Sequence, residues 1–96
     1  MNSNLTLDFV SNIKLKHNNP MVIYKNKEVY EIIGEDADWC IENIGLPNIS
    51  KKGDCSYVSY LCANQHITSK IIKLAQKGIT FIDEIPTGTF LQLSLF

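Results

Sequence analysis

The amino-acid sequence predicts a single α/β domain: a mixed β-sheet with two to three helices packed on it. The chain of 96 residues has the length of one small domain, and its 45% hydrophobic and 20% charged residues are ordinary for a folded protein. Short runs with strand periodicity alternate with segments of helical periodicity, which indicates a sheet with helices packed against it. No internal repeat or low-complexity linker divides the sequence.

The first predicted element is a strand over residues 5–10, LTLDFV, in which apolar and polar side chains alternate. The polar residues 11–19 predict a loop, with a short extended piece at 13–15, and Pro20 closes this loop. We therefore expect the N-terminal segment to contribute a strand to the sheet.

A β-hairpin is predicted over residues 21–33, MVIYKNKEVYEII, because both halves are rich in β-branched and aromatic residues. The turn is expected at Asn26-Lys27, since Asn tolerates the positive φ that a tight hairpin turn needs. Lys is less suited to the second turn position than Gly, which leaves the type of turn open.

The first predicted helix follows Gly34 and ends at Gly45, after which Pro47 prevents it from resuming. Its core face has the spacing i, i+3, i+4, i+7 and consists of Ala37, Cys40, Ile41 and Ile44. Its first turn carries three carboxylates that complement the helix dipole: Glu35, Asp36 and Asp38.

The second half of the chain predicts a strand at residues 55–61, CSYVSYL, and a helix at 64–78, NQHITSKIIKLAQKG, with Gly78 just past the helix end. The expected core face of this helix consists of Ile67, Ile71 and Leu74. A strand at residues 79–85, ITFIDEI, and a Pro-Thr-Gly turn lead into the last stretch, TFLQLSLF. The predicted order is one strand, a two-stranded hairpin, a helix, a strand, a helix and two strands.

Charge and cysteine content narrow the functional classes. A net charge of −1 gives no whole-molecule attraction to nucleic acid or to an anionic membrane, so any nucleic-acid contact has to come from a local patch. No apolar run reaches membrane-spanning length, and the N-terminus lacks the basic and apolar regions of a signal peptide. An odd number of irregularly spaced cysteines, Cys40, Cys55 and Cys62, argues against a disulfide framework and predicts a reducing, cytoplasmic setting.

Sites for metal or catalytic chemistry are weak in this sequence. Cys55, Cys62 and His66 make a poor candidate metal site, because there is no CxxC pair and structural zinc takes four ligands; small buried thiols are favoured, and we expect no metal or cofactor. There is no GxxxxGK[ST] or GxSxG motif, and nothing orients Cys62 and His66 as nucleophile and base. The adjacent Asp83 and Glu84 would point to opposite faces of a strand. We expect that the protein is not an enzyme.

Two stretches, NPMVIYKNKEVYEIIGEDADWCIENIGLPNI and KIIKLAQKGITFIDEI, carry a family resemblance. They resemble the N-terminal mismatch-recognition domain, domain I, of the MutS family of DNA mismatch repair proteins. The family has a hairpin written GDFYE, an apolar pair, a helix start containing Asp-Ala, and later a helix of the form YLxKLVxxG before an apolar strand. The similar positions here are Tyr30-Glu31, Ile32-Ile33, Glu35-Asp36-Ala37, Ile44-Gly45 and residues 71–82. The resemblance covers most of residues 19–85 and implies a domain of this type over residues 1–91.

The resemblance implies a DNA-reading pair on the hairpin that is degenerate in this chain. In the family, the Phe of a Phe-x-Glu pair wedges into the base stack and the Glu hydrogen-bonds the displaced base; Val29 and Glu31 stand at these places. Stacking of a base on an aromatic side chain contributes about 1–3 kcal/mol, and valine has no π face. Lys27 replaces the turn glycine, and residues 61–63, LCA, replace a Gly-x-Pro segment. The ATPase and lever parts of a MutS protein have no counterpart in this sequence. Without the aromatic wedge, the resemblance implies weak or non-specific binding to double-stranded DNA.

Lysines are the candidate contacts to DNA phosphates. Lys25 and Lys27 flank the hairpin turn, and Lys51-Lys52 lie in a predicted loop. Three more occupy positions i, i+3 and i+7 of the second predicted helix: Lys70, Lys73 and Lys77. For the helix lysines, an ordinary solvated face is the favoured alternative.

Trp39 is a candidate partner contact. It falls on the polar side of the first predicted helix, among Glu35, Asp38 and Glu42. A tryptophan in such a position either contacts another protein or packs under another segment of its own chain, and both interpretations stay open.

The last five residues, 92–96 or QLSLF, also have two interpretations. Alternation of Leu91, Leu93 and Leu95 with polar residues predicts a strand. The same residues resemble the peptide Gln-Leu-(Ser or Asp)-Leu-Phe by which bacterial replication and repair proteins bind the DNA polymerase sliding clamp. This resemblance implies that Leu93, Leu95 and Phe96 enter an apolar cleft and that the Gln92 amide bonds its rim.

Together these features predict a monomeric, non-enzymatic DNA-binding module of mismatch-repair type, with residues 92–96 as a tail that recruits it to the sliding clamp. The alternative is a protein-interaction module that binds the clamp or another repair protein through Trp39 and the tail, without DNA contact. A third interpretation, an uncharacterised hydrolase, is less favoured than these two, because the sequence offers no nucleophile–base set.

Overall fold

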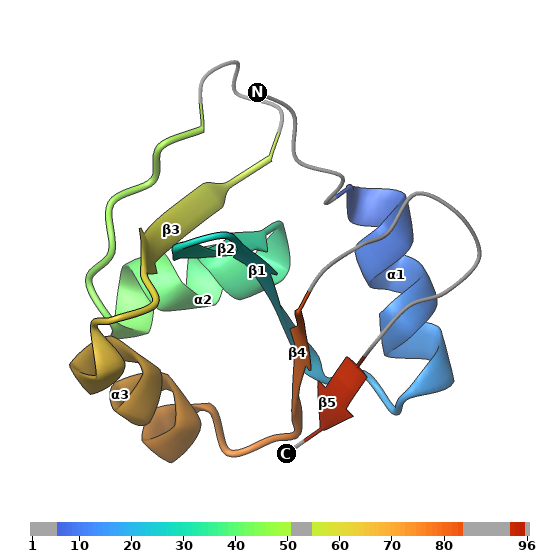
Figure 1. The fold of residues 1–96 in the computed structure, drawn as a ribbon. Coiled ribbons are helices and arrows are strands. Elements are labelled where there is room, and N and C mark those ends of the chain that lie inside the picture. Colours follow the sequence, from blue (N-terminus) through green and yellow to red (C-terminus); the bar gives the residue numbers. More distant parts are fainter. Residues whose placement is uncertain (1–5, 51–54, 84–92, 96) are drawn as a thin grey trace.

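A computed structural model describes residues 6–50, 55–83 and the backbone of 93–95. The described chain forms a five-stranded mixed sheet, so the predicted α/β class is confirmed (Figure 1). The spatial order is β3-β2-β1-β4-β5, in which β1 and β4 are parallel and the other neighbours are antiparallel. The strands are β1 (Met21–Asn26), β2 (Val29–Ile33), β3 (Tyr57–Leu61), β4 (Ile79–Ile82) and β5 (Leu93–Leu95).

Helices cover both faces of this sheet (Figure 1). On one face lie α2 (Glu35–Asn43) and α3 (Gln65–Ala75), over a core that includes Ile23, Ile32 and Ile71. The opposite face carries α1 (Leu7–Lys16) over a second, smaller apolar cluster. This cluster consists of Val10, Ile13, Val22, Tyr24, Ile33 and Ile82.

The N-terminal predictions were wrong, because α1 occupies the segment for which a strand at 5–10 and a loop with an extended piece at 13–15 were expected. The Thr6 side chain accepts a hydrogen bond of 3.1 Å from the Phe9 amide and caps the helix. Val10 and Ile13, at helical spacing, are both buried against the sheet. The cap and this spacing outweigh the short alternation that indicated a strand.

The two later helices form where the sequence predicts them, with one error in the core face of α3. In α2, Ala37 and Cys40 are fully buried. In α3, Ile71 is fully buried, but Leu74 is 44% exposed instead of facing the core. The buried stripe of α3 follows the spacing i, i+4 through Ile67, Ile71 and Ala75, and Leu74 lies beside it. The helix ends at Gln76, which adopts φ 56°, two residues before the glycine that was expected to end it.

The hairpin is confirmed, but its turn lies one residue later than predicted. Asn26 is the last residue of β1 and pairs with Val29. The positive φ of the turn falls on Lys27, at 61°, which is a left-handed conformation that a non-glycine residue adopts at an energetic cost.

A buried ion pair joins the two layers of helices to the central strand. Lys14 Nζ of α1 lies 2.9 Å from Asp36 Oδ2 of α2, and their side chains are only 12% and 4% exposed. The same Asp36 oxygen accepts a hydrogen bond of 3.1 Å from the Val22 amide of β1. Lys14 also donates to the Pro20 carbonyl oxygen at 2.8 Å. β2 ends at Ile33, and the chain then enters α2. The Asp36 carboxylate therefore accepts the hydrogen bond of the Val22 amide that a neighbouring strand would otherwise accept.

We expect Asp36→Ala to lower the free energy of unfolding by about 3–5 kcal/mol, because it leaves the Val22 amide without an acceptor and the Lys14 ammonium buried without its close carboxylate. Glu35→Ala is the matched control: that carboxylate is 3.8 Å from Lys14 but 73% exposed, so its loss should change stability by less than about 1 kcal/mol. Urea unfolding followed by the fluorescence of the single tryptophan, Trp39, measures both. Equal losses in the two variants would contradict this assignment.

Candidate nucleic-acid interface

The first candidate surface is the part of β2 that resembles the mismatch-reading hairpin. Val29 and Glu31 share one face of the strand, as expected from their i, i+2 spacing. This is the face that carries α1, because Glu31 lies opposite Tyr24 in the β1–β2 ladder. On β3, Leu61 lies opposite Val29 and is 59% exposed. The hairpin therefore presents a small apolar pair, Val29 and Leu61, beside the Glu31 carboxylate.

Glu31 itself is a buried side chain, only 6% exposed. Its Oε2 accepts a hydrogen bond of 2.7 Å from the Tyr57 hydroxyl and a weaker one of 3.4 Å from the Asn26 side-chain amide. Its Oε1 has no hydrogen-bond partner in the described part of the chain. Sequence reasoning did not find Tyr57 and Asn26 as partners, because the contacts follow from the pairing register of three strands.

The hydrogen bond to Glu31 also affects the pKa of Tyr57. Burial raises the pKa of Tyr57 to about 12, and the hydrogen bond to the Glu31 carboxylate and its negative charge contribute in the same direction. All these effects favour the neutral phenol, which is the form that donates the hydrogen bond. Tyr57 therefore fixes the orientation of Glu31 at neutral pH.

Because its pKa in the folded protein lies above the ordinary value of 10, Tyr57 contributes stability that is complete below pH 10 and is lost as the pH rises toward 12. We expect Glu31→Gln to lower the pKa of Tyr57 part of the way toward 10. Alkaline titration of phenolate absorbance measures the change, with Tyr57→Phe identifying the transition that belongs to this residue. An unchanged transition in Glu31→Gln would mean that the carboxylate has no influence on the phenol.

Two of the candidate lysines belong to the hairpin. Lys27 is exposed in the hairpin turn. Lys25 is in β1 on the α3 side of the sheet, where its ammonium lies 3.9 Å from a carboxylate oxygen of Asp83. This pair was not predicted, because it depends on the parallel pairing of β1 with β4. Lys51 and Lys52 lie outside the described residues.

The remaining lysines form a basic surface on and just beyond α3. Lys70, Lys73 and Lys77 are all exposed, and none forms an ion pair with a carboxylate in the described part of the chain. The sequence from residue 55 to residue 82 contains no Asp or Glu. The positive charge of this surface is therefore not neutralised within its own segment.

Trp39 is half-buried and packs against the core between α2 and α3. It borders a hollow of about 220 Å³ together with Met21, Ala75 and Lys77. The indole thus already has neighbours in its own chain, and a partner contact would use only its exposed part.

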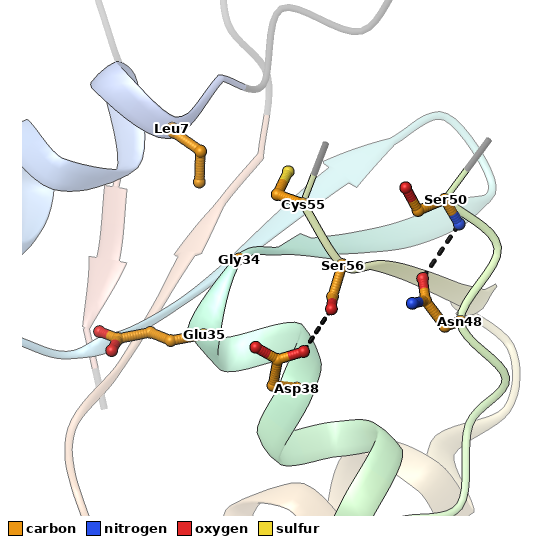
Figure 2. Close-up of a pocket in the computed structure, with 8 residues that line it drawn as sticks. All are labelled: Leu7, Gly34, Glu35, Asp38, Asn48, Ser50, Cys55 and Ser56. Carbon is orange, nitrogen blue, oxygen red and sulfur yellow. Dashed lines mark hydrogen bonds between the residues drawn. The ribbon is translucent and has the colours of Figure 1, made fainter. Parts of the chain in front are cut away.

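A larger hollow of about 510 Å³ lies where α1, α2 and the start of β3 meet (Figure 2). Its polar groups bond one another: the Ser56 hydroxyl donates to Asp38, and the Asn48 side-chain oxygen accepts from the backbone amides of Ser50 and Tyr57. These bonds hold the segment that leads into β3 against α2. At the floor, Gly34 has φ 74°, and an added Cβ would come within 2.9 Å of Leu7.

The two cysteines of the candidate metal site are not brought together. Cys55 precedes β3 and Cys62 follows it, so the two thiols are at opposite ends of that strand, and all three cysteines are free. In the parts of the chain that are described, no group of three or more His, Cys, Asp or Glu side chains is arranged to hold a metal ion. Burial, with a smaller effect of the Asp36 charge, raises the pKa of Cys40 to about 12, which keeps this thiol protonated.

The backbone of residues 93–95 forms β5, which pairs antiparallel with β4 at one edge of the sheet. Leu93 lies opposite Ile82 and Leu95 opposite Thr80. Gln92 and Phe96 lie outside the described residues. A strand is thus present in the tail, and binding of the clamp by the same residues remains a prediction.

Within the described ranges, no helix is long and apolar enough to cross a membrane. The chain matches no protein-family model and none of the curated proteins.

Proposed function

We propose that this protein is a non-enzymatic DNA-binding module of the mismatch-repair type, which contacts the backbone of double-stranded DNA weakly through the basic surface of α3. The observation that carries the proposal is the exposed set Lys70, Lys73 and Lys77 in a segment without any acidic residue. Lys70 and Lys73 are separated by about 4.5 Å along the axis of α3, and Lys77 follows the end of the helix, so the three ammonium groups are available to neighbouring phosphates of one backbone.

Contact with base edges is not part of this proposal. Val29 cannot stack on a base, and Glu31 is buried and bonded to Tyr57. Phosphate contacts position a protein on DNA but carry no sequence information, so we expect similar affinity for matched and mismatched duplexes. Lys27, exposed at the hairpin turn, would add a further phosphate contact. The proposed location is the cytoplasm, where the free thiols would persist, and the proposed state is a monomer.

The charge reversal Lys70→Glu would not distinguish weakened attraction from new repulsion, so neutral replacements are the better test. We expect the triple variant Lys70→Gln, Lys73→Gln, Lys77→Gln to lower the slope of log affinity against log salt by about 0.9 for each phosphate that the protein no longer neutralises. Fluorescence anisotropy of a labelled duplex at several salt concentrations measures the slope. Lys16→Gln, an exposed lysine on α1 across the sheet, is the matched control and should leave the slope unchanged. An unchanged slope in the triple variant would remove the basis of the proposal.

A second candidate is a protein-interaction module recruited to the sliding clamp through residues 92–96. One observation favours it: Leu93–Leu95 already has an extended backbone and forms a three-residue strand at the edge of the sheet. An extended peptide is the form in which alternate side chains enter pockets of a partner. Trp39, half-exposed on α2, would be an additional contact.

We expect removal of residues 92–96, and separately Leu95→Ala with Phe96→Ala, to abolish binding of purified sliding clamp. Both should leave duplex binding through α3 unchanged, which also verifies that the variants are folded. Surface plasmon resonance with immobilised clamp, and anisotropy with duplex, are the two measurements. Clamp binding without any duplex binding would favour the interaction module, and an absence of both would overturn both proposals.

A further inference from the structure

A hollow of about 370 Å³ opens on the α3 side of the sheet, at the carboxyl ends of the parallel strands β1 and β4. β1 and β4 are neighbours in the sheet, and each is followed in the chain by a strand on its far side. β1 is followed by β2, which pairs with the edge of β1 away from β4. β4 is followed by β5, which pairs with the edge of β4 away from β1. This is the place in an open α/β sheet where the strand order reverses, and ligands commonly bind in the crevice that results. We call the hollow the switch-point pocket; its lining includes Lys25, Tyr30, Thr68, Ile72, Phe81 and Asp83.

The inner wall of the switch-point pocket is aromatic and apolar. The rings of Tyr30 and Phe81 are 5.4 Å apart and inclined by 56°. Ile72 of α3 lies beside them and remains 46% exposed. The Thr68 hydroxyl on the same helix is hydrogen-bonded to the Tyr60 hydroxyl at 2.7 Å, so it belongs to the wall. An aromatic ring that enters the pocket can make an offset-stacked or edge-to-face contact with these side chains.

At the rim of the switch-point pocket, the hydrogen-bond donor Lys25 and the acceptor Asp83 lie side by side. The register Ile23↔Phe81, continued by two residues, places Lys25 opposite Asp83, and their charged atoms are 3.9 Å apart. The two side chains are 44% and 66% exposed, so their mutual attraction is screened by water and contributes little to stability. Both groups are therefore available to a ligand at small cost.

We propose that the switch-point pocket binds a guanine base. The Asp83 carboxylate has two oxygens that accept from the N1–H and N2–H groups of guanine, while the Lys25 ammonium donates to O6. The ring then lies against Tyr30 and Phe81. Adenine presents one donor beside one acceptor and cytosine one donor beside two acceptors, so neither can occupy both carboxylate oxygens. Thymine presents two acceptors around one donor. Guanine is thus the base whose edge matches this rim most completely.

This inference rests on the proposed function in one respect: whether the guanine belongs to a DNA strand or to a free nucleotide. An unpaired guanine in a DNA strand is the source that fits a DNA-binding module, because a base has to leave the stack to reach such a pocket. A free guanine nucleotide has the same edge and is the other source. The test therefore uses both probes with the full chain.

The first probe is a single-stranded oligothymidine with one central guanine, compared with the same strand carrying adenine. The second is guanosine monophosphate, compared with adenosine monophosphate. We expect the wild-type protein to prefer guanine by about tenfold or more, and Asp83→Asn to abolish this preference, since a bidentate contact discriminates by that order. Glu28→Gln, an exposed carboxylate in the hairpin turn outside the pocket, is the control and should keep it. Chemical-shift changes of Tyr30 and Phe81 on adding the nucleotide would locate the base.

The outcomes separate the two proposals. Binding of oligothymidine without base preference would overturn the guanine pocket and leave the phosphate contacts of α3 untouched. A preference for guanine that survives Asp83→Asn would also overturn it, because the base would be read elsewhere. Binding of guanosine monophosphate without binding of either single strand would support the pocket and identify a free nucleotide as its ligand, while the proposed function would still be decided by the duplex titration. Since Asp83 is 66% exposed, an unchanged unfolding midpoint of Asp83→Asn verifies that only the rim was altered.

Discussion

The ion pair between Lys14 and Asp36 is the contact on which the arrangement of the layers depends. It joins a helix on one face of the sheet to a helix on the other, and through the Val22 amide it also satisfies the central strand where β2 departs. A carboxylate with these two roles is costly to bury alone and firmly held when both partners are present. The position of α1, and with it the cover over Tyr24 and Ile33, follows from this contact.

With the layers held in this way, opposite charges are distributed over neighbouring helices on the same face of the sheet. Most of the acidic residues between positions 28 and 42 belong to α2, and the same stretch contains no lysine or arginine. The adjacent α3, by contrast, contains no acidic residue, and its charged residues are lysines. The net charge of −1 is therefore the sum of local fields of opposite sign. An anionic ligand approaching this face would be directed toward α3 and the rim at Lys25, away from α2.

The sequence predicts this fold well wherever one local signal dominates. The hairpin, α2, β3, α3 and β4 are each bounded by turn or cap residues and have one clear period. The N-terminal helix was missed because two periods compete there: Leu7 and Phe9 alternate, while Val10 and Ile13 are spaced for a helix capped by Thr6. Periodicity alone cannot choose between them; burial against the sheet decides.

The candidate sites were less predictable than the fold, because their key contacts are made between distant strands. The lysines of α3 were visible from their helical spacing. The partners of Glu31 and of Lys25 were not, since Tyr57 and Asp83 approach them only through strand register. No local pattern in the sequence specifies that β4 pairs with β1 and not with β3.

That pairing has a consequence for how the chain folds. The strands β1, β2 and β3 follow one another along the sheet, so their contacts close short loops or loops of moderate length. β4 reaches β1 only after α2, β3 and α3 have been traversed, so the centre of the sheet forms through the longest loop closure among the described strands. During synthesis, one edge of β1 stays without a neighbour until most of the chain has left the ribosome. For that interval the nascent protein exposes the hydrogen-bonding groups of the described strand with the longest buried run, Met21–Tyr24, and this leaves β1 open to pairing with another chain.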